Sequence, residues 1–197
     1  MRTPPTADDA YQRFSEYALA VGKVVYAWNY LQGKLGRLFA ATIPTAPPNV
    51  ILAIWHSEPN DKAQRRMLRA SINSGAFENH PLAEMLPDSA GADIIWLLNE
   101  ADALGFRRDL AVHAPAMMMT TAAKGTQMEP AFYMGSPIAQ KLRGRSLIDE
   151  FTLSEWRAER LAEYATRAEW ALFPEQPHPW PKKRPSLSRQ LHRRRTE

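Results

Sequence analysis

The chain of 197 residues contains no cysteine, which excludes disulfide bonds, thiolate metal ligands and a cysteine nucleophile. It also has no apolar run approaching the roughly 18 residues that a membrane-spanning helix requires. The segment from Met1 to Asp9 is polar and holds two prolines, so it lacks the apolar region of a secretory signal. We therefore expect a soluble, cytoplasmic protein without a membrane partner.

Several motifs of catalysis and ligand binding are missing as well. The sequence has no P-loop, no Gly-rich dinucleotide fingerprint, no zinc-ligand spacing and no serine in a nucleophile elbow. We therefore predict no cofactor and no metal. Hydrophobic residues make up 45% and charged residues 23% of the chain, which is the composition of a globular domain, and the length suffices for one core.

Basic residues are concentrated near the C-terminus. Residues 182–197 contain one acid and seven basic residues, so this stretch carries a formal charge of +6 and the rest of a chain of net charge +4 carries −2. The basic residues are Lys182, Lys183, Arg184, Arg189, Arg193, Arg194 and Arg195. Residues 176–197 are Pro-rich and then basic, which predicts a disordered tail. This tail either captures RNA through its phosphates, or binds an acidic partner, or only aids solubility.

Apolar residues at helical spacing predict an all-α domain over residues 9–175, preceded by a flexible N-terminus at 1–8. Four main helices are expected at 9–41, 60–73, 92–113 and from Thr152 to about residue 173, with a short one at 49–56. Thr152 and Glu155 have the spacing of a capping box. Residues 117–134 contain two β-permissive runs around Lys124-Gly125, which indicate a small β-hairpin insertion. An up-and-down helical bundle is the natural packing of such elements.

Two helices carry charged residues of interest. On the helix at 60–73 we expect a solvated basic face opposite Leu68 and Ile72, formed by Lys62, Arg65, Arg66 and Arg69. On the helix at 92–113, Arg108 follows Leu104 by four positions and so continues its apolar stripe. An arginine on a buried face needs an anionic or hydrogen-bonding partner, because desolvating an unpaired charge is costly.

Asp109 and His113 are four residues apart, which places them on one face of the same helix, where the carboxylate can orient the imidazole. Arg108 and His113 are five apart and point roughly 140° away from each other around an ideal helix. They converge only if the helix loosens near Ala114 or if a second chain contributes.

The segment Arg108-Asp109-Leu110-Ala111-Val112-His113 resembles the motif of the HEPN superfamily (higher eukaryote and prokaryote nucleotide-binding domains). That motif is an Arg, a polar residue and a His four to six positions after the Arg. The order of elements over about residues 10–173 also resembles small bacterial HEPN-like proteins, which have a long tryptophan-bearing first helix, a short pair, the motif helix, a variable insertion and a closing helix.

The resemblance implies metal-independent cleavage of RNA by a homodimer, and a bacterial toxin or defence effector with an antitoxin partner. His113 would act as general base or acid toward the ribose 2′-hydroxyl or the leaving oxygen, Arg108 would hold the phosphate, and Asp109 would orient His113. Arg107, on another face, would contact backbone phosphates. Two alternatives remain: an ordinary salt-bridged helix end, and a non-catalytic helical module that binds nucleic acid or protein through the basic tail.

Overall fold

The computed structural model describes residues 6–113, 116–121, 125–130, 142 and 145–188. Its elements are α1 (Ala7–Ala41), α2 (Pro48–Ser57), α3 (Asp61–Asn73), a 3-10 turn η1 (Ala83–Met85), α4 (Ala90–His113), β1 (Ala116–Thr121), β2 (Gly125–Pro130) and α6 (Leu147–Ala171). The prediction of a mostly helical bundle with a small hairpin is confirmed. None of the helices in these ranges is long and apolar enough to cross a membrane.

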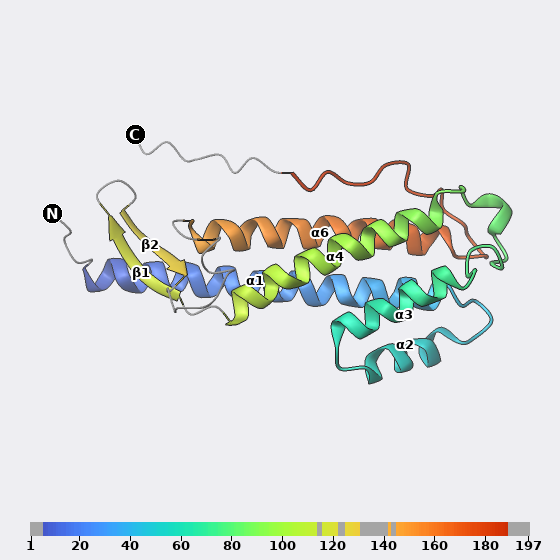
Figure 1. Cartoon of the computed structure of the whole chain (residues 1–197), viewed down its shortest axis with the longest axis horizontal. Coiled ribbons are helices and arrows are strands. Elements are labelled where there is room, and N and C mark those ends of the chain that lie inside the picture. Colours follow the sequence, from blue (N-terminus) through green and yellow to red (C-terminus); the bar gives the residue numbers. More distant parts are fainter. Residues whose placement is uncertain (1–5, 114–115, 122–124, 131–141, 143–144, 189–197) are drawn as a thin grey trace.

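Successive helices alternate in direction, and α1 and α6 lie side by side and run in the same direction (Figure 1). Tyr17 meets Phe151 near the start of both helices, with ring centroids 5.8 Å apart. Further along, Arg37 pairs with Glu169 at 2.9 Å. The contact between α1 and α6 is the most extensive between any two helices. These two helices therefore form the central pair of the bundle.

The core fills the space between α1, α4 and α6, and is extended by α2 and α3. It is built from the apolar stripes that the sequence predicts, with fully buried members such as Trp28, Leu35, Leu97 and Leu161. Helices that bury one stripe derive most of their stability from this packing rather than from intrinsic propensity. This packing fixes the positions of the helices, and with them the charged side chains at the edge of the core.

The start of α6 corrects one expectation. The helix begins at Leu147, five residues before the predicted Thr152, and its N-cap is Ser146, whose hydroxyl accepts the backbone N–H of Asp149. Thr152 instead lies inside the helix and its hydroxyl donates to the carbonyl of Ile148. The additional turn buries Leu147 and Phe151 against α1, and this tertiary contact decides where the helix begins.

The β-hairpin lies where the sequence predicts it. β1 and β2 pair antiparallel, with Met118 opposite Met128 and Thr121 opposite Gly125. Gly125 has a φ of +63°, a conformation that glycine adopts without strain. Lys124, the other residue of the predicted turn, is outside the described residues.

Residues 176–188, here called the C-terminal arm, depart from the disorder predicted for the tail. The arm runs back along α4 and α6 (Figure 1). The Trp180 indole N–H and the Arg184 guanidinium both donate to Asp93 of α4, at 3.1 and 2.8 Å. Leu187 packs against the core, and its carbonyl accepts the Arg157 guanidinium. These polar contacts and the partly buried indole of Trp180 hold the arm against the bundle, although its composition predicts disorder.

Candidate functional site

Arg108 has the anionic partner that its place on the apolar stripe predicts. Its Nη2 donates to Asp61 Oδ2 at 2.6 Å, and three quarters of its side chain is buried. Its Nε lies 3.4 Å from Asp109 Oδ1 but has no well-oriented hydrogen bond. The main charge partner of Arg108 is therefore on α3, the helix that packs beside α4.

Asp61 is held in place from two sides. It is the first residue of α3, where Asn60 is the N-cap and the helix dipole favours a carboxylate. The same Oδ2 that binds Arg108 also accepts the Trp28 indole N–H at 2.8 Å. The Arg108 guanidinium carbon is 5.2 Å from the Trp28 ring centroid, within the range of a cation–π contact. Trp28, Asp61 and Arg108 thus form one connected unit that joins α1, α3 and α4.

Arg65 belongs to the same unit, which corrects the expectation of a solvated face at this position. It is buried, with 5% of its surface exposed. Its Nε donates to Asp102 Oδ1 at 2.7 Å, and its guanidinium carbon lies 5.1 Å from the Trp28 ring centroid. Arg69 also reaches Asp102, and donates to Asn99. The ion pairs of α3 therefore bind it to α4.

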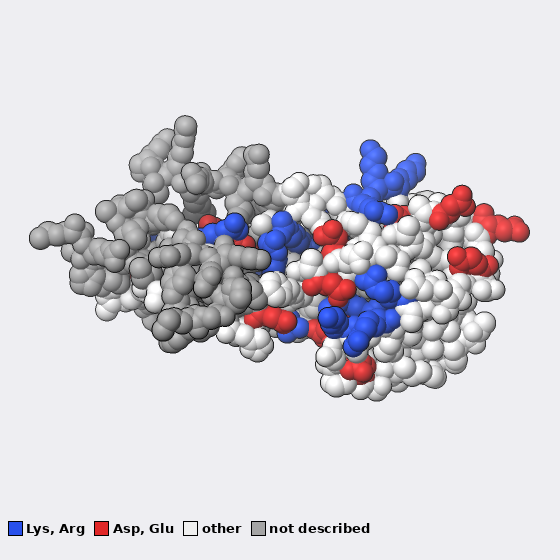
Figure 2. All heavy atoms as spheres, in the orientation of Figure 1, with Lys and Arg blue, Asp and Glu red and all other residues white. Residues whose placement is uncertain are grey.

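These side chains border an open cleft of about 680 Å³, here called the Trp28 cleft. Its charged lining balances, with three cations and three carboxylates: Lys62, Arg65, Arg108, Asp61, Asp102 and Asp109. Figure 2 shows the corresponding mixture of basic and acidic side chains over α3 and α4. A phosphate entering this cleft would meet carboxylates as well as arginines.

His113 lies outside the Trp28 cleft. It is exposed in the last turn of α4, and it is not among the residues that line the cleft. Asp109 is 58% exposed and faces Arg108. In the part of the chain that the structure describes, no hydrogen bond joins Asp109 to His113. Because α4 stays helical through His113, one chain alone brings Arg108 and Asp109 together but not Arg108 and His113.

Arg107 faces the start of α6 instead of the cleft. Its Nη1 lies 3.7 Å from Glu150 Oε2, and Glu150 also binds Arg145. The pKa of the nearby Arg157 guanidinium is lowered, mainly by burial and secondly by the positive charge of Arg107. Arg107 is therefore part of an ion-pair group that connects α4 to α6.

The basic residues of the tail fall into two groups. Within the arm, Lys182 and Lys183 are exposed. Arg184 instead forms an ion pair with Asp93, and its guanidinium carbon lies 5.4 Å from the Trp96 ring centroid. Figure 2 shows Lys and Arg side chains projecting along this arm. The remaining predicted contacts are outside the described residues: Arg189, Arg193, Arg194 and Arg195.

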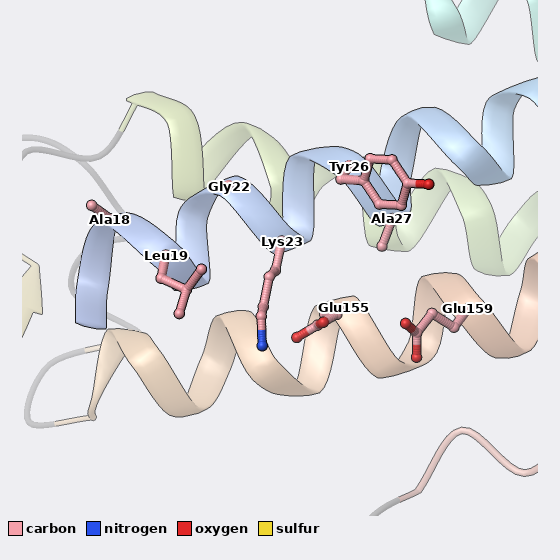
Figure 3. Close-up of a pocket in the computed structure, with 8 residues that line it drawn as sticks. All are labelled: Ala18, Leu19, Gly22, Lys23, Tyr26, Ala27, Glu155 and Glu159. Atoms are coloured by element: carbon pink, nitrogen blue, oxygen red, sulfur yellow. The ribbon is translucent and has the colours of Figure 1, made fainter. Parts of the chain in front are cut away.

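A second concavity lies between α1 and α6. This groove of about 320 Å³ is mostly apolar, and Leu19, Gly22 and Tyr26 line its α1 side. Figure 3 shows Lys23 extending from α1 toward Glu155 of α6, with Glu159 one turn further along. No histidine or arginine lines the groove, so it lacks the side chains that the predicted chemistry needs. Within the described ranges, no group of three or more His, Asp or Glu side chains is placed to hold a metal ion.

Comparisons with protein-family models, curated proteins and solved structures find no match for this chain. The HEPN resemblance therefore rests on the motif at Arg108 to His113 and on the order of the helices.

Proposed function

We propose that this chain is a HEPN-like, metal-independent endoribonuclease. The observation that carries the proposal is the placement of the motif: Arg108 is fixed at the edge of an open cleft, and His113 is exposed five residues later at the carboxyl end of the same helix. In the proposed enzyme, two copies of the chain pair so that the His113 of one faces the Arg108 of the other. The proposal includes a role as a bacterial toxin or defence effector.

The chemistry follows from the side chains. A histidine acting as general base takes the proton of a ribose 2′-hydroxyl, and the 2′-oxygen attacks the adjacent phosphorus. The 5′-oxygen then leaves and receives a proton from a general acid. A guanidinium carries five N–H donors, and Asp61 occupies Nη2 of Arg108. Other N–H groups of Arg108 remain to bind phosphate oxygens and stabilise their charge in the transition state. The nucleophile belongs to the ribose, so the substrate is RNA and not DNA.

The test is cleavage of a fluorogenic single-stranded RNA in EDTA by the wild type and by His113→Ala. We expect the variant to lose about 10²- to 10⁴-fold in rate, the usual contribution of a general acid or base. His56→Ala is the matched control, because His56 is also an exposed histidine in the last turn of a helix, α2. Circular dichroism checks that all three proteins fold.

Three results would contradict the proposal. These are wild-type activity that disappears in EDTA, activity that survives His113→Ala, and equal losses in the His113 and His56 variants. Sedimentation of the wild type tests the homodimer separately, since a monomer with full activity excludes a site shared between two chains.

A second function has an observation of its own in its favour. Arg108 is already neutralised by Asp61 and the Trp28 cleft carries balanced charges, as expected for a structural ion pair in a non-catalytic module. Such a module binds nucleic acid or a protein partner through the basic tail. Deletion of residues 182–197 then removes binding, whereas His113→Ala leaves binding unchanged.

A further inference from the structure

A concave surface lined by residues of α6 and of the C-terminal arm differs in its charge from the Trp28 cleft. It is formed where the C-terminal arm passes the end of α6, and its volume is about 600 Å³. We call it the Trp170 pocket. None of the residues lining it also lines the Trp28 cleft, so the two are separate surfaces.

The exposed aromatic side chain of the Trp170 pocket is Trp170 itself, which contacts the C-terminal arm. Trp170 is 45% exposed, and its ring lies 5.4 Å from the ring of His178 at an angle of 39°. The backbone N–H of His178 donates to the carbonyl of Trp170. Trp180, which also lines the pocket, is fixed by its bond to Asp93. The pocket thus presents a large aromatic surface whose position the arm stabilises.

The charges of the Trp170 pocket all have one sign. Arg167, Lys182 and Lys183 line it, and no carboxylate does. Arg167 is paired with Glu163, which lies outside the lining. Among the described residues, neither Lys182 nor Lys183 forms an ion pair. An exposed indole beside two uncompensated ammonium groups matches a nucleotide unit, since bases stack on aromatic rings and phosphates attract lysines.

We propose that the Trp170 pocket binds single-stranded RNA, with one base stacked on Trp170 and neighbouring phosphates at Lys182 and Lys183. This inference rests on the proposed action on RNA, but it assigns binding to a surface away from the motif. The pocket would hold the strand while a more distant part of the same strand reaches the site of cleavage.

The experiment measures fluorescence anisotropy of a labelled 12-nucleotide oligouridylate in EDTA, with the full chain carrying His113→Ala so that the RNA stays intact. Trp170→Ala should bind roughly tenfold more weakly, as expected for the loss of one stacked base, and Trp170→Phe should recover part of the loss. Its control is Tyr30→Ala, because Tyr30 is 49% exposed on α1 and also has a lysine, Lys34, beside its ring.

A second pair of variants tests the phosphate contacts. Lys182→Ala/Lys183→Ala should lower affinity and make the slope of log K against log salt shallower by about 1.4, since each contact to a single strand contributes about 0.7. Lys23→Ala/Lys34→Ala has the same net charge and should bind like the wild type. Adenosine monophosphate should displace the oligomer only weakly, because it offers a single phosphate.

Each outcome decides the inference independently of the nuclease. Loss of binding confined to the Trp170 and Lys182/Lys183 variants supports it, even if the wild type cleaves nothing. Wild-type affinity in Trp170→Ala, equal losses in the control variants, or displacement by adenosine monophosphate at the same concentration as by unlabelled oligomer would overturn it. A chain that cleaves RNA but binds it without Trp170 retains the proposed function and loses this inference.

Discussion

His80 is a buried histidine whose two ring nitrogens both lie against backbone groups. Only 4% of the residue is exposed. Its Nδ1 accepts the backbone N–H of Leu82 at 3.2 Å, and its Nε2 lies 3.3 Å from the carbonyl oxygen of Ala41. The neutral ring with its proton on Nε2 satisfies both contacts, whereas a second proton on Nδ1 would break the bond to Leu82. Burial accordingly lowers the pKa of His80 below its usual value of 6.5, and the hydrogen bond to Ala41 opposes this shift.

This environment predicts that the protein loses stability in mild acid. Below pH 6.5 the unfolded chain binds a proton at His80 while the folded chain does not, so the free energy of unfolding falls as the pH falls. Urea denaturation of the wild type at pH 7.5 and pH 5.5 measures the loss. His80→Gln, which cannot gain a charge, should show a smaller difference between the two pH values. A difference as large as that of the wild type would assign the effect to other groups.

At the scale of single residues, the sequence predicts some of the site and misses the rest. Arg108 needs an anion because it continues an apolar stripe, and that need is visible in the sequence. Arg65 precedes Leu68 by three residues and Ile72 by seven, a spacing that places it on the buried face. Its burial is therefore visible in the sequence, although the cluster of four basic residues on this helix favours a solvated face. The choice of Asp61 as the partner of Arg108 depends on how α3 meets α4, which no local pattern encodes.

Among the elements, α1 approaches α2 closely at one glycine. A Cβ added at Gly36 would lie 2.9 Å from Trp55 Cδ1, whereas one added at Gly33, a turn earlier in α1, would meet nothing within 4 Å. Trp55 is fully buried, so a side chain at position 36 would press on a packed core residue, whereas one at position 33 would contact nothing.

We therefore predict opposite effects of alanine at these positions. Gly36→Ala should lower the free energy of unfolding by about 1–3 kcal/mol, the usual cost of an overpacked core. Gly33→Ala should raise it by up to about 1 kcal/mol, because alanine favours a helix more than glycine does. Urea denaturation of both variants gives the comparison. Equal shifts in the same direction would show that helix propensity, and not the contact with Trp55, controls this part of α1.

The helices themselves are predicted well because each buries one apolar stripe, and a stripe is periodic in the sequence. The start of α6 is the exception. Ser146 and Asp149 have the same spacing as Thr152 and Glu155, so both pairs fit a helix start. The earlier one is used because Leu147 and Phe151 pack on α1, and that packing comes from residues more than a hundred positions away.

At the scale of the whole molecule, the C-terminal arm binds back onto α4 and α6. Asp93 binds both Trp180 and Arg184, which follow it by 87 and 91 residues. Composition alone predicts disorder for a Pro-rich and basic segment, and separations of this size explain why the docking of the arm could not be read from local sequence.

Asp93→Asn should release the arm. Hydrogen bonds to charged groups contribute about 1.5–3 kcal/mol, so the undocked population should rise roughly tenfold or more. Trypsin cleavage after Lys182 and Lys183 should accelerate in proportion, because cleavage follows the population of the open form. Mass spectrometry identifies the cut sites. Asp88→Asn, at an exposed acid just before α4, is the control, and similar cleavage rates in both variants would show that Asp93 does not hold the arm.

The pairing of α1 with α6 joins two helices that lie far apart in the sequence, so α1 is synthesised long before its main partner. The apolar face of α1 is complete once Ala41 has been made, but the helix that covers most of it ends only at Ala171. At a typical rate of about 5–20 residues per second, the ribosome needs roughly 6 to 26 seconds to add the residues between Ala41 and Ala171. During that interval the face of α1 that α6 will cover is exposed to chaperones and to other nascent chains. Among the described elements, α2, α3, α4 and β2 are made before α6 and also contact α1.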